Sequence, residues 1–340
     1  MGEKSKSKAV RLPFLIAMGV ALVGFGVVSG IAFDMATRPA APPKAFPVSE
    51  VHASRAAPMP KVVSPPSAAG ESAPGAGSIL DANTPRAWAP EQQAAVTQPP
   101  LTAFAVATAA DPNRPALAIV IDDMGLDRPR ALQMIGLRGP LTLSLMTYAH
   151  DLAGLVKQAH GGGHEVMAHL PMEPVNPKEN PGRGALMGKM DDDAIRKTLA
   201  ADLDGWSGYV GINNHMGSRF TADRNRMAVV MEELKSRGLM WLDSRTINDT
   251  AGPGAARAIG VPFITRDIFL DNVETVDAVR VQLELAKATA RSRGTAVAIG
   301  HPHDATITAL KEWLPSLEAA GVVLVPATEI LRRRNERAPS

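Results

Sequence analysis

The chain has 340 residues, which is enough for one large domain or two small ones. It contains no cysteine, which excludes disulfides, thiol nucleophiles and thiolate metal ligands, so any metal must be held by histidine, aspartate or glutamate. The formal net charge is only +2, and the basic residues gather at the two ends without interleaved aromatic residues, so nothing indicates nucleic-acid binding.

Residues 1–36 have the pattern of a membrane anchor. Four basic residues lie within residues 1–11 and precede an uncharged, mostly apolar run over residues 12–33, which is long enough to span about 30 Å of hydrocarbon. The positive-inside rule then predicts a cytoplasmic N-terminus, with the rest of the chain across the membrane. A cleaved signal peptide is the alternative, although its apolar core usually has only about 7–15 residues. We expect a single-pass protein of a bacterial inner membrane.

Residues 37–113 are rich in alanine, proline, serine and glycine, as in the stretch PPSAAGESAPGAG. Such a segment buries too little apolar surface to offset the entropy lost on ordering, and its prolines favour extended conformers. The sequence therefore predicts a disordered linker that holds the following domain away from the membrane.

Short apolar runs alternate with amphipathic stretches over residues 114–335. Strands are predicted over residues 116–121, 141–145, 164–169, 209–213, 239–243, 261–265, 295–299 and 322–325. Helices are predicted over residues 128–136, 150–160, 191–205, 223–237, 252–259, 273–293, 304–319 and 328–335. This alternation implies parallel strands with right-handed crossovers, as in an α/β fold. Seven or eight units fit a (β/α) barrel, irregular or incompletely closed, with an open doubly wound sheet as the alternative.

Polar residues that can carry chemistry gather where the predicted strands end. They are Asp122, Asp123, His169, Asn213, Asn214, His215, Asp243, Ser244, His301 and His303. Taken singly, each has an ordinary explanation, such as a helix cap for an aspartate or a turn for an asparagine. The carboxyl ends of barrel strands converge on one face, however, and active sites are built there. Five strands that end in such residues therefore indicate one common site.

The residue types at this predicted site suit a divalent-metal hydrolase. Imidazoles and a carboxylate, with one position left for water, are the usual ligands of catalytic zinc. The metal lowers the pKa of the water and polarises a carbonyl, while a free carboxylate serves as base and a histidine as acid. No glycine-rich or Walker sequence opens a predicted helix, so no nucleotide site is expected.

Five motifs resemble those of polysaccharide deacetylases, and most closely those of their divergent branch. They read IDDMG, HLPMEP, GINNHMGS, WLDSRT and IGHPH, and they cover about residues 114–335. The resemblance implies a metal-dependent enzyme that removes N-acetyl groups from amino sugars. It implies Asp122 as the general base, Asp123 as a metal ligand, His301 as the acid with His303 as a competitor, and Asp243 as the residue that tunes the acid.

The second motif departs from the HxxxH pattern of that family, because Glu173 stands where the second histidine is expected after His169. His215 in GINNHMGS is the candidate for the missing imidazole. We therefore expect zinc or another divalent ion to be held by Asp123, His169 and His215. Glu173 and His303 are alternative ligands, and the expected contacts with substrate come from Asn213, Asn214, Glu173 and His303.

The preferred function is the deacetylation of an N-acetylated envelope glycan by a periplasmic domain, because an anchor and a linker suit an extended substrate. The first alternative is an inactive glycan-binding or scaffold protein, for which the altered second motif argues. The second is another metal-dependent amidase or esterase on the same barrel. Residues 174–190 are polar and rich in proline and glycine, as in loops that shape access to a barrel mouth. Arg219 is expected either to bind a negatively charged glycan or to pair with Asp223.

Overall fold

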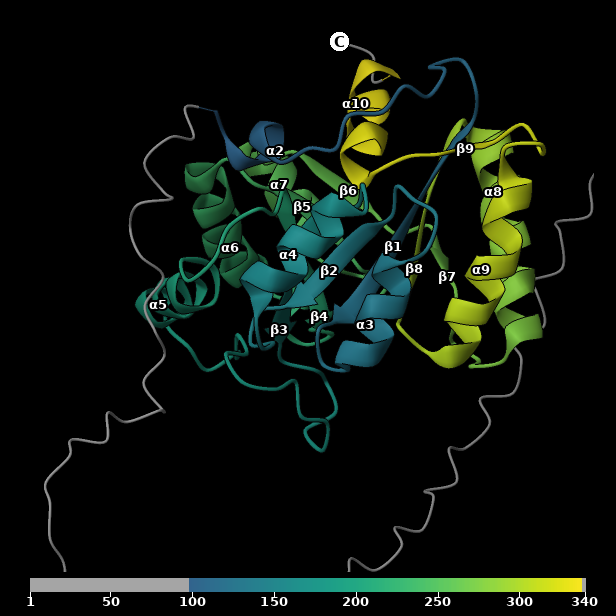
Figure 1. Cartoon of the computed structure of the whole chain (residues 1–340). Helices are drawn as coiled ribbons and strands as arrows, with labels where there is room; N and C mark the ends of the chain where they lie inside the picture. Colours follow the sequence, from purple (N-terminus) through teal and green to yellow (C-terminus); the bar gives the residue numbers. More distant parts are fainter. Residues whose placement is uncertain (1–97, 338–340) are drawn as a thin grey trace, which may run out of the picture. The chain divides into compact units, whose positions relative to one another are not determined.

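The computed structural model describes residues 98–337 (Figure 1). The predicted anchor and most of the predicted linker fall within residues 1–97 and therefore lie outside the described residues. Within the described part of the chain, no helix has both the length and the apolar character needed to cross a membrane.

The described chain alternates strands and helices. The strands are β1 (Ala116–Met124), β2 (Thr142–Met146), β3 (Glu165–Met172), β4 (Gly211–Met216), β5 (Met240–Asp243), β6 (Phe263–Thr265), β7 (Ile268–Phe269), β8 (Thr295–Gly300) and β9 (Val323–Leu324). The helices are α2 (Pro100–Ala103), α3 (Arg128–Ile135), α4 (Leu152–Gly161), α5 (Asp192–Leu203), α6 (Arg224–Arg237), α7 (Gly252–Ile259), α8 (Val276–Arg293), α9 (Asp304–Leu317) and α10 (Ala327–Arg337), with a 3₁₀ turn η2 (Phe220–Ala222) before α6.

Helix starts follow the capping residues of the sequence. Asp127 caps α3 by accepting a hydrogen bond from the Arg130 backbone N–H, and Asp191 caps α5 in the same way. Thr275 caps α8, and its acceptance of the Ala278 N–H fixes where that long helix begins. Each of these caps fixes the point where the loop after a strand ends and the next helix begins. The loops at the carboxyl ends of these strands are therefore anchored by the strand on one side and by the capped helix on the other.

All strands of the sheet run parallel in the order β6-β5-β4-β3-β2-β1-β8-β7, and β9 pairs with the start of β1. This is the strand order of an eight-stranded barrel that is open between β6 and β7. Within residues 98–337 no ladder joins these two strands, although they follow one another in the chain. The eight strands thus curl into a half-barrel, which confirms the predicted incompletely closed barrel and excludes the doubly wound alternative.

Two hydrophobic clusters occupy the two faces of the curled sheet. Leu117, Ile119 and Ile121 of β1 pack into the outer cluster under the helices, while Ala118 and Val120 pack into the inner cluster. Figure 1 shows α8 beside α9 at one edge of the sheet and α5 beside α6 near the other. Because alternate residues of a strand point to opposite faces, membership of a cluster tells which face each neighbouring residue uses.

The segment over residues 98–113, which the sequence analysis assigned to the linker, packs against the domain before β1. Leu101 and Phe104, on α2 and directly after it, pack with Ala110 against the inner cluster. Arg333 of α10 holds the same segment by donating hydrogen bonds to the Asp111 and Arg114 carbonyls at 3.2 and 2.7 Å. A few apolar side chains among many small ones are thus enough to attach residues 98–113 to the domain.

A buried carboxylate closes the amino end of the half-barrel. Glu165 at the start of β3 is fully buried and accepts hydrogen bonds from the Thr142 hydroxyl at 3.2 Å and from the Thr328 N–H and hydroxyl. Burial raises the pKa of Glu165 to about 7, although the hydrogen bonds from Thr328 and Thr142 act in the opposite direction. Glu165 therefore connects β2 and β3 to the C-terminal helix α10.

The raised pKa of Glu165 predicts a pH-dependent stability. The fold favours the neutral carboxyl, so the stability that this group provides is complete below about pH 4.5 and is lost as the pH rises through about 7. Over that interval the free energy of unfolding should fall by about 3 kcal/mol more in the wild type than in Glu165→Gln. Denaturant unfolding at a series of pH values measures this difference, with the exposed Glu318→Gln as control. Parallel pH profiles for the wild type and Glu165→Gln would contradict the prediction.

Candidate functional site

The inner face of the half-barrel carries the predicted site residues at the carboxyl ends of its strands. Val120 and Met167 belong to the inner cluster, so the next alternate residues, Asp122 and His169, point to the same side. Asn213 is paired in register with His169, and His215 with Pro171, which places both of them on this side as well. The inner face of the sheet thus gathers residues from β1, β3 and β4 that lie up to nearly a hundred positions apart in the chain.

Asp123 joins this group through an irregularity of β1. Its φ angle of 55° is left-handed, and the register of β1 against β2 shifts between Ile121 and Met124. A non-glycine residue in this conformation costs about 1–3 kcal/mol and persists only where its surroundings hold it. The turn takes Asp123 out of the strand alternation, so two adjacent carboxylates serve the same site.

Asp123, His169 and His215 offer one ligand atom each, and these atoms lie within 4.8 Å of one another. The Asp123 Oδ1 atom is 2.8 Å from His215 Nδ1 and 3.2 Å from His169 Nε2. That oxygen is buried and neither contact has hydrogen-bond geometry, so a buried polar atom stands without a partner between two imidazoles. A metal ion would satisfy all three atoms.

The donor set fits zinc. Tetrahedral zinc with ligand bonds of about 2.0–2.1 Å separates its ligand atoms by about 3.3 Å, close to the distances between these nitrogens and the oxygen. Burial alone would raise the pKa of Asp123, but the adjoining His169 and His215 lower it far below its usual range, which keeps the carboxylate charged. Three protein ligands leave one position for water, as in catalytic zinc sites.

The side chain of Asn213 connects His169 and Asp122 through hydrogen bonds. Its side-chain oxygen accepts from His169 Nδ1 at 2.8 Å and from the Ser144 hydroxyl, while its amide nitrogen donates to Asp122 Oδ1 at 2.7 Å and to the Ser244 hydroxyl at 3.1 Å. With Nδ1 of His169 as the donor, Nε2 presents its lone pair to the metal position. Asn213 thus fixes the tautomer of one imidazole and the orientation of one carboxylate.

The two asparagines differ from the expectation that they contact substrate. Asn213 is fully buried, and its hydrogen-bonding atoms are all used within the protein. Asn214 is also buried: its oxygen accepts from the Ser244 N–H at 3.0 Å and its nitrogen donates to the Met216 carbonyl at 2.8 Å. Both side chains therefore position the ends of β4 and β5 and are closed to a ligand.

Asp122 is more deeply buried than Asp123. Its side chain is 4% exposed, and its Oδ2 atom is 3.8 Å from His169 Nε2. Burial raises the pKa of Asp122, against the attraction of His169 and His301 and the hydrogen bond from Asn213. The two adjacent carboxylates therefore have opposite pKa shifts, which is the arrangement expected when one binds a cation and the other exchanges a proton.

His301 follows β8, and its partner is Asp271, a residue that the sequence analysis did not select. His301 Nδ1 is 3.0 Å from Asp271 Oδ1, and Asp271 Oδ2 accepts from the His301 N–H and the Thr306 hydroxyl. Burial opposes protonation of His301, but the hydrogen bond to Asp271 and the charge of Asp122 outweigh it and raise the pKa of His301 to about 9. Asp271 holds the ring so that Nε2 is left for a ligand.

Asp243 does not take the place that was expected for it beside His301. Leu242 belongs to the inner cluster and Trp241 to the outer one, so Asp243 points outward from β5. There it accepts hydrogen bonds from the Arg245 N–H and the Thr250 hydroxyl, both at 2.8 Å, and it shapes the turn before α7. The aspartate that contacts His301 is Asp271.

The two alternative metal ligands occupy different surroundings. Glu173 is outside the Asp123 group: it accepts a hydrogen bond from the Gly188 N–H, and its Oε1 atom lies 3.6 Å from Arg219 Nε. His303 forms a second set of metal-ligating side chains with Asp271 and His301, again with ligand atoms within 4.8 Å, and its Nε2 atom is 3.6 Å from Glu274. His303 thus lies beside His301 at the carboxyl ends of the strands. Glu173 instead anchors the loop after β3 through the Gly188 N–H.

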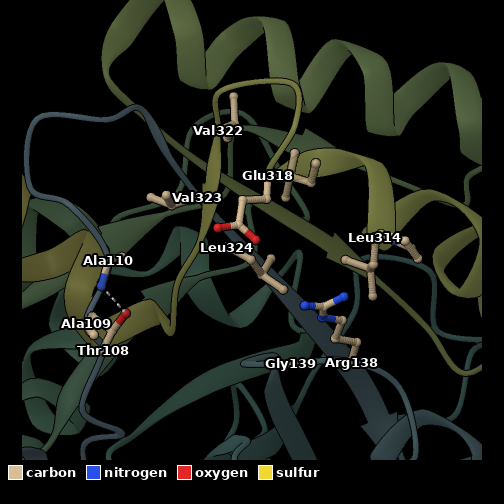
Figure 2. Close-up of a pocket in the computed structure, with 12 residues that line it drawn as sticks. Thr108, Ala109, Ala110, Arg138, Gly139, Leu314, Glu318, Val322, Val323 and Leu324 are labelled. Atoms are coloured by element: carbon tan, nitrogen blue, oxygen red, sulfur yellow. Dashed lines mark hydrogen bonds between the residues drawn. The ribbon is translucent and has the colours of Figure 1, made fainter.

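A separate pocket of about 310 Å³ lies at the opposite, amino end of the strands (Figure 2). Figure 2 shows Arg138 and Glu318 as the charged side chains drawn there, with Leu324 of β9 between them. Gly139, which precedes β2, and the end of α9 complete the wall. None of the predicted site residues lines this pocket, so it is separate from the candidate site at the carboxyl ends of the strands.

Loss of the His215 imidazole should strongly weaken zinc binding. His215→Ala is expected to weaken zinc affinity by more than about 100-fold, because substituting a partner behind the ligands already costs about 10–100-fold. Zinc titration by calorimetry and elemental analysis of the purified protein measure the effect, and His150→Ala serves as an exposed-histidine control. Full zinc occupancy in His215→Ala would remove His215 from the ligand set.

Removal of the Asp271 carboxylate should lower the pKa of His301. Charged His301 stabilises the fold fully below about pH 6.5, and that stability is lost as the pH rises through about 9. In Asp271→Asn the pKa should move down toward 6.5, which NMR titration of the imidazole in chelator-treated protein reports. An unchanged titration midpoint would show that Asp271 does not set the protonation of His301.

Three comparisons place the chain among known proteins. The family described as divergent polysaccharide deacetylase matches residues 119–331. The chain is 35% identical over 215 residues to the uncharacterized protein YibQ of Escherichia coli (strain K12), covering 63% of this chain and 67% of YibQ. It is 32% identical over 206 residues to an uncharacterized protein of Haemophilus influenzae (strain ATCC 51907 / DSM 11121 / KW20 / Rd), covering 59% and 71% of the two chains.

A solved structure has a similar fold. The crystal structure of the uncharacterized protein ATU2773 from Agrobacterium tumefaciens C58 matches with a TM-score of 0.66 and 25% sequence identity, over 68% of this chain and 95% of that chain. The match to residues 119–331 covers more than half of the sequence and includes all five motifs found in it. The chain therefore belongs to the divergent polysaccharide deacetylase family.

Proposed function

We propose that the protein is a metal-dependent deacetylase that hydrolyses N-acetyl groups of an envelope polysaccharide. The observation that carries the proposal is that the imidazoles of His169 and His215 face one buried, unpartnered oxygen of Asp123. The carboxylate of Asp122 and the imidazole of His301, whose pKa is raised to about 9, lie beside this group. Amide hydrolysis needs a polarised carbonyl, a base for water and an acid for the leaving nitrogen. The site offers a group for each requirement.

Asp123, His169 and His215 would hold the ion, and zinc, when bound, supplies polarisation of the acetyl carbonyl and a lowered pKa of water. Asp122 acts as the general base and accepts a proton from the water that attacks the acetyl carbon. The Asn213 amide holds Asp122 Oδ1, so Oδ2 is the oxygen that remains to take the proton. The raised pKa of Asp122 makes it a better base than an ordinary aspartate.

His301 acts as the general acid. With a pKa of about 9 it is protonated at neutral pH, and Asp271 occupies Nδ1, so Nε2 carries the proton that passes to the amide nitrogen. Breaking the C–N bond then releases acetate and the free amine of the sugar. Base and acid come from adjacent strands, because the ladder of β1 with β8 pairs Ile121 with Gly300, immediately before Asp122 and His301.

The alternative of an inactive glycan-binding protein rests on Glu173, which replaces the histidine expected in the second motif. The position of His215, at 2.8 Å from the Asp123 carboxylate, supports activity instead, because it returns a second imidazole to the ligand set. The apolar run over residues 12–33 supports the further proposal that the domain works at the outer face of an inner membrane.

Substitution of the base should separate metal binding from turnover. Asp122→Asn should lower acetate release from N-acetylglucosamine oligomers by about 100- to 10,000-fold, because general acid–base groups contribute about that much, while zinc content stays unchanged. The exposed Asp249→Asn on the loop after β5 is the control. Binding of these oligomers by the zinc-loaded wild type, without any acetate release, would favour the binding protein.

A further inference from the structure

We infer that a pocket beside the metal group binds the carboxylate of an acidic glycan. This inference rests on the proposed function and names its substrate class. The pocket has a volume of about 380 Å³, and its charged lining consists of Glu173, Lys189, Arg219, Asp223 and Arg226. No cofactor or catalytic role in the proposed reaction uses these side chains.

The pocket is built by the two loops that follow the metal-binding strands. Glu173 comes four residues after His169, and Arg219 comes four residues after His215. The backbone N–H groups of Arg219 and Phe220 both donate to the Glu173 carbonyl at 3.1 Å, which ties the loop after β3 to the loop after β4. A glycan chain that presents an acetyl group to the metal position would therefore lie next to this pocket.

The carboxylates of the pocket are already engaged. Asp223 caps α6 through the Asn225 and Arg226 N–H groups and pairs with the Arg226 guanidinium. Glu173 accepts the Gly188 N–H through its Oε2 atom. Asp223 is therefore held on Arg226, and Glu173 is the carboxylate of the lining that lies beside Arg219.

Two cations of the pocket can still take a ligand. Arg219 lies 3.6 Å from Glu173 and donates one hydrogen bond to the Val175 carbonyl at 3.3 Å, but its side chain is 54% exposed and its other N–H groups are open to a ligand. Of the two functions expected for Arg219, pairing with Asp223 does not occur, because Asp223 pairs with Arg226. Lys189 is exposed and forms no ion pair with any residue of the described part of the chain. Three cations against two carboxylates leave the pocket with one excess positive charge.

The single excess positive charge favours binding of a singly charged anion. An arginine beside a lysine favours an anion that is planar. The guanidinium offers a fork of N–H donors that matches the two oxygens of a carboxylate, and the lysine adds a point charge from the opposite loop. Among sugars that alternate with N-acetylated residues, uronic acids carry such a group. The loops after β3 and β5 add Arg183 and Arg245, which form no ion pair among residues 98–337, so further cations lie near the path of an anionic chain.

Calorimetry on the full-length, zinc-loaded Asp122→Asn protein tests this inference without turnover. The probes are a tetrasaccharide of alternating N-acetylglucosamine and glucuronate and its methyl ester. The acid should bind about tenfold more tightly than the ester, since one charge-assisted contact has roughly that effect. Lys189→Ala and Arg219→Ala should each abolish the preference without changing the affinity for the ester.

Two further variants control for general charge and for folding. Lys178→Ala removes a cation of the same loop that does not line the pocket and should keep the preference, as should the conservative Lys189→Arg. Equal affinity for acid and ester in the parent protein, or an equal loss in Lys178→Ala, would overturn the inference. Acetate release by the wild type from neutral N-acetylglucosamine oligomers tests the proposed function separately, so each proposal can fail alone.

Discussion

The site depends on one break in a regular pattern: the left-handed turn that brings Asp123 to the same side as Asp122. In an uninterrupted strand, the two carboxylates would point to opposite faces, and only one of them would reach the mouth of the half-barrel. The turn at φ 55° carries a conformational cost, and the imidazoles of the buried His169 and the partly buried His215 face the oxygen that it delivers. Two like charges can then be neighbours because one of them lies between two imidazoles, where a cation could also be held.

A second constraint is that the polar groups under the mouth form one connected network. Asn213 contacts Asp122, His169, Ser144 and Ser244, so the proposed base and one proposed metal ligand share a single fully buried amide. In a low-dielectric interior such a network is rigid when every member is satisfied. The chain therefore fixes the protonation geometry of its site with a residue that no ligand touches.

Much of this architecture was predictable from the sequence, because strand runs and helix caps are local features. The eight predicted strands and eight predicted helices all occur, and the gathering of Asp122, His169, His215 and His301 follows from strand direction. The position of Asp123 depends in addition on the left-handed turn at the end of β1. The motif predicted a role for Asp243 beside His301, but it does not show which face of β5 the side chain occupies. In the structure, Asp243 points to the outer face. Asp271 was missed because β7 has only two residues, too few to show an alternation, and becomes significant only through its pairing with β8. The hydrogen bonds of Asn213 are tertiary and leave no local signal.

The opening of the half-barrel between β6 and β7 separates two properties of the site mechanically. The residues of the candidate metal group come from β1, β3 and β4 in the middle of the sheet, where each strand has neighbours on both sides. Asp271 follows β7, an edge strand whose ladder with β8 consists of Ile268 and Phe269. A shift of that edge would change the contact between Asp271 and His301 and leave Asp123, His169 and His215 in place. Variation at this edge would therefore alter the pH range over which His301 is charged without altering the candidate metal group.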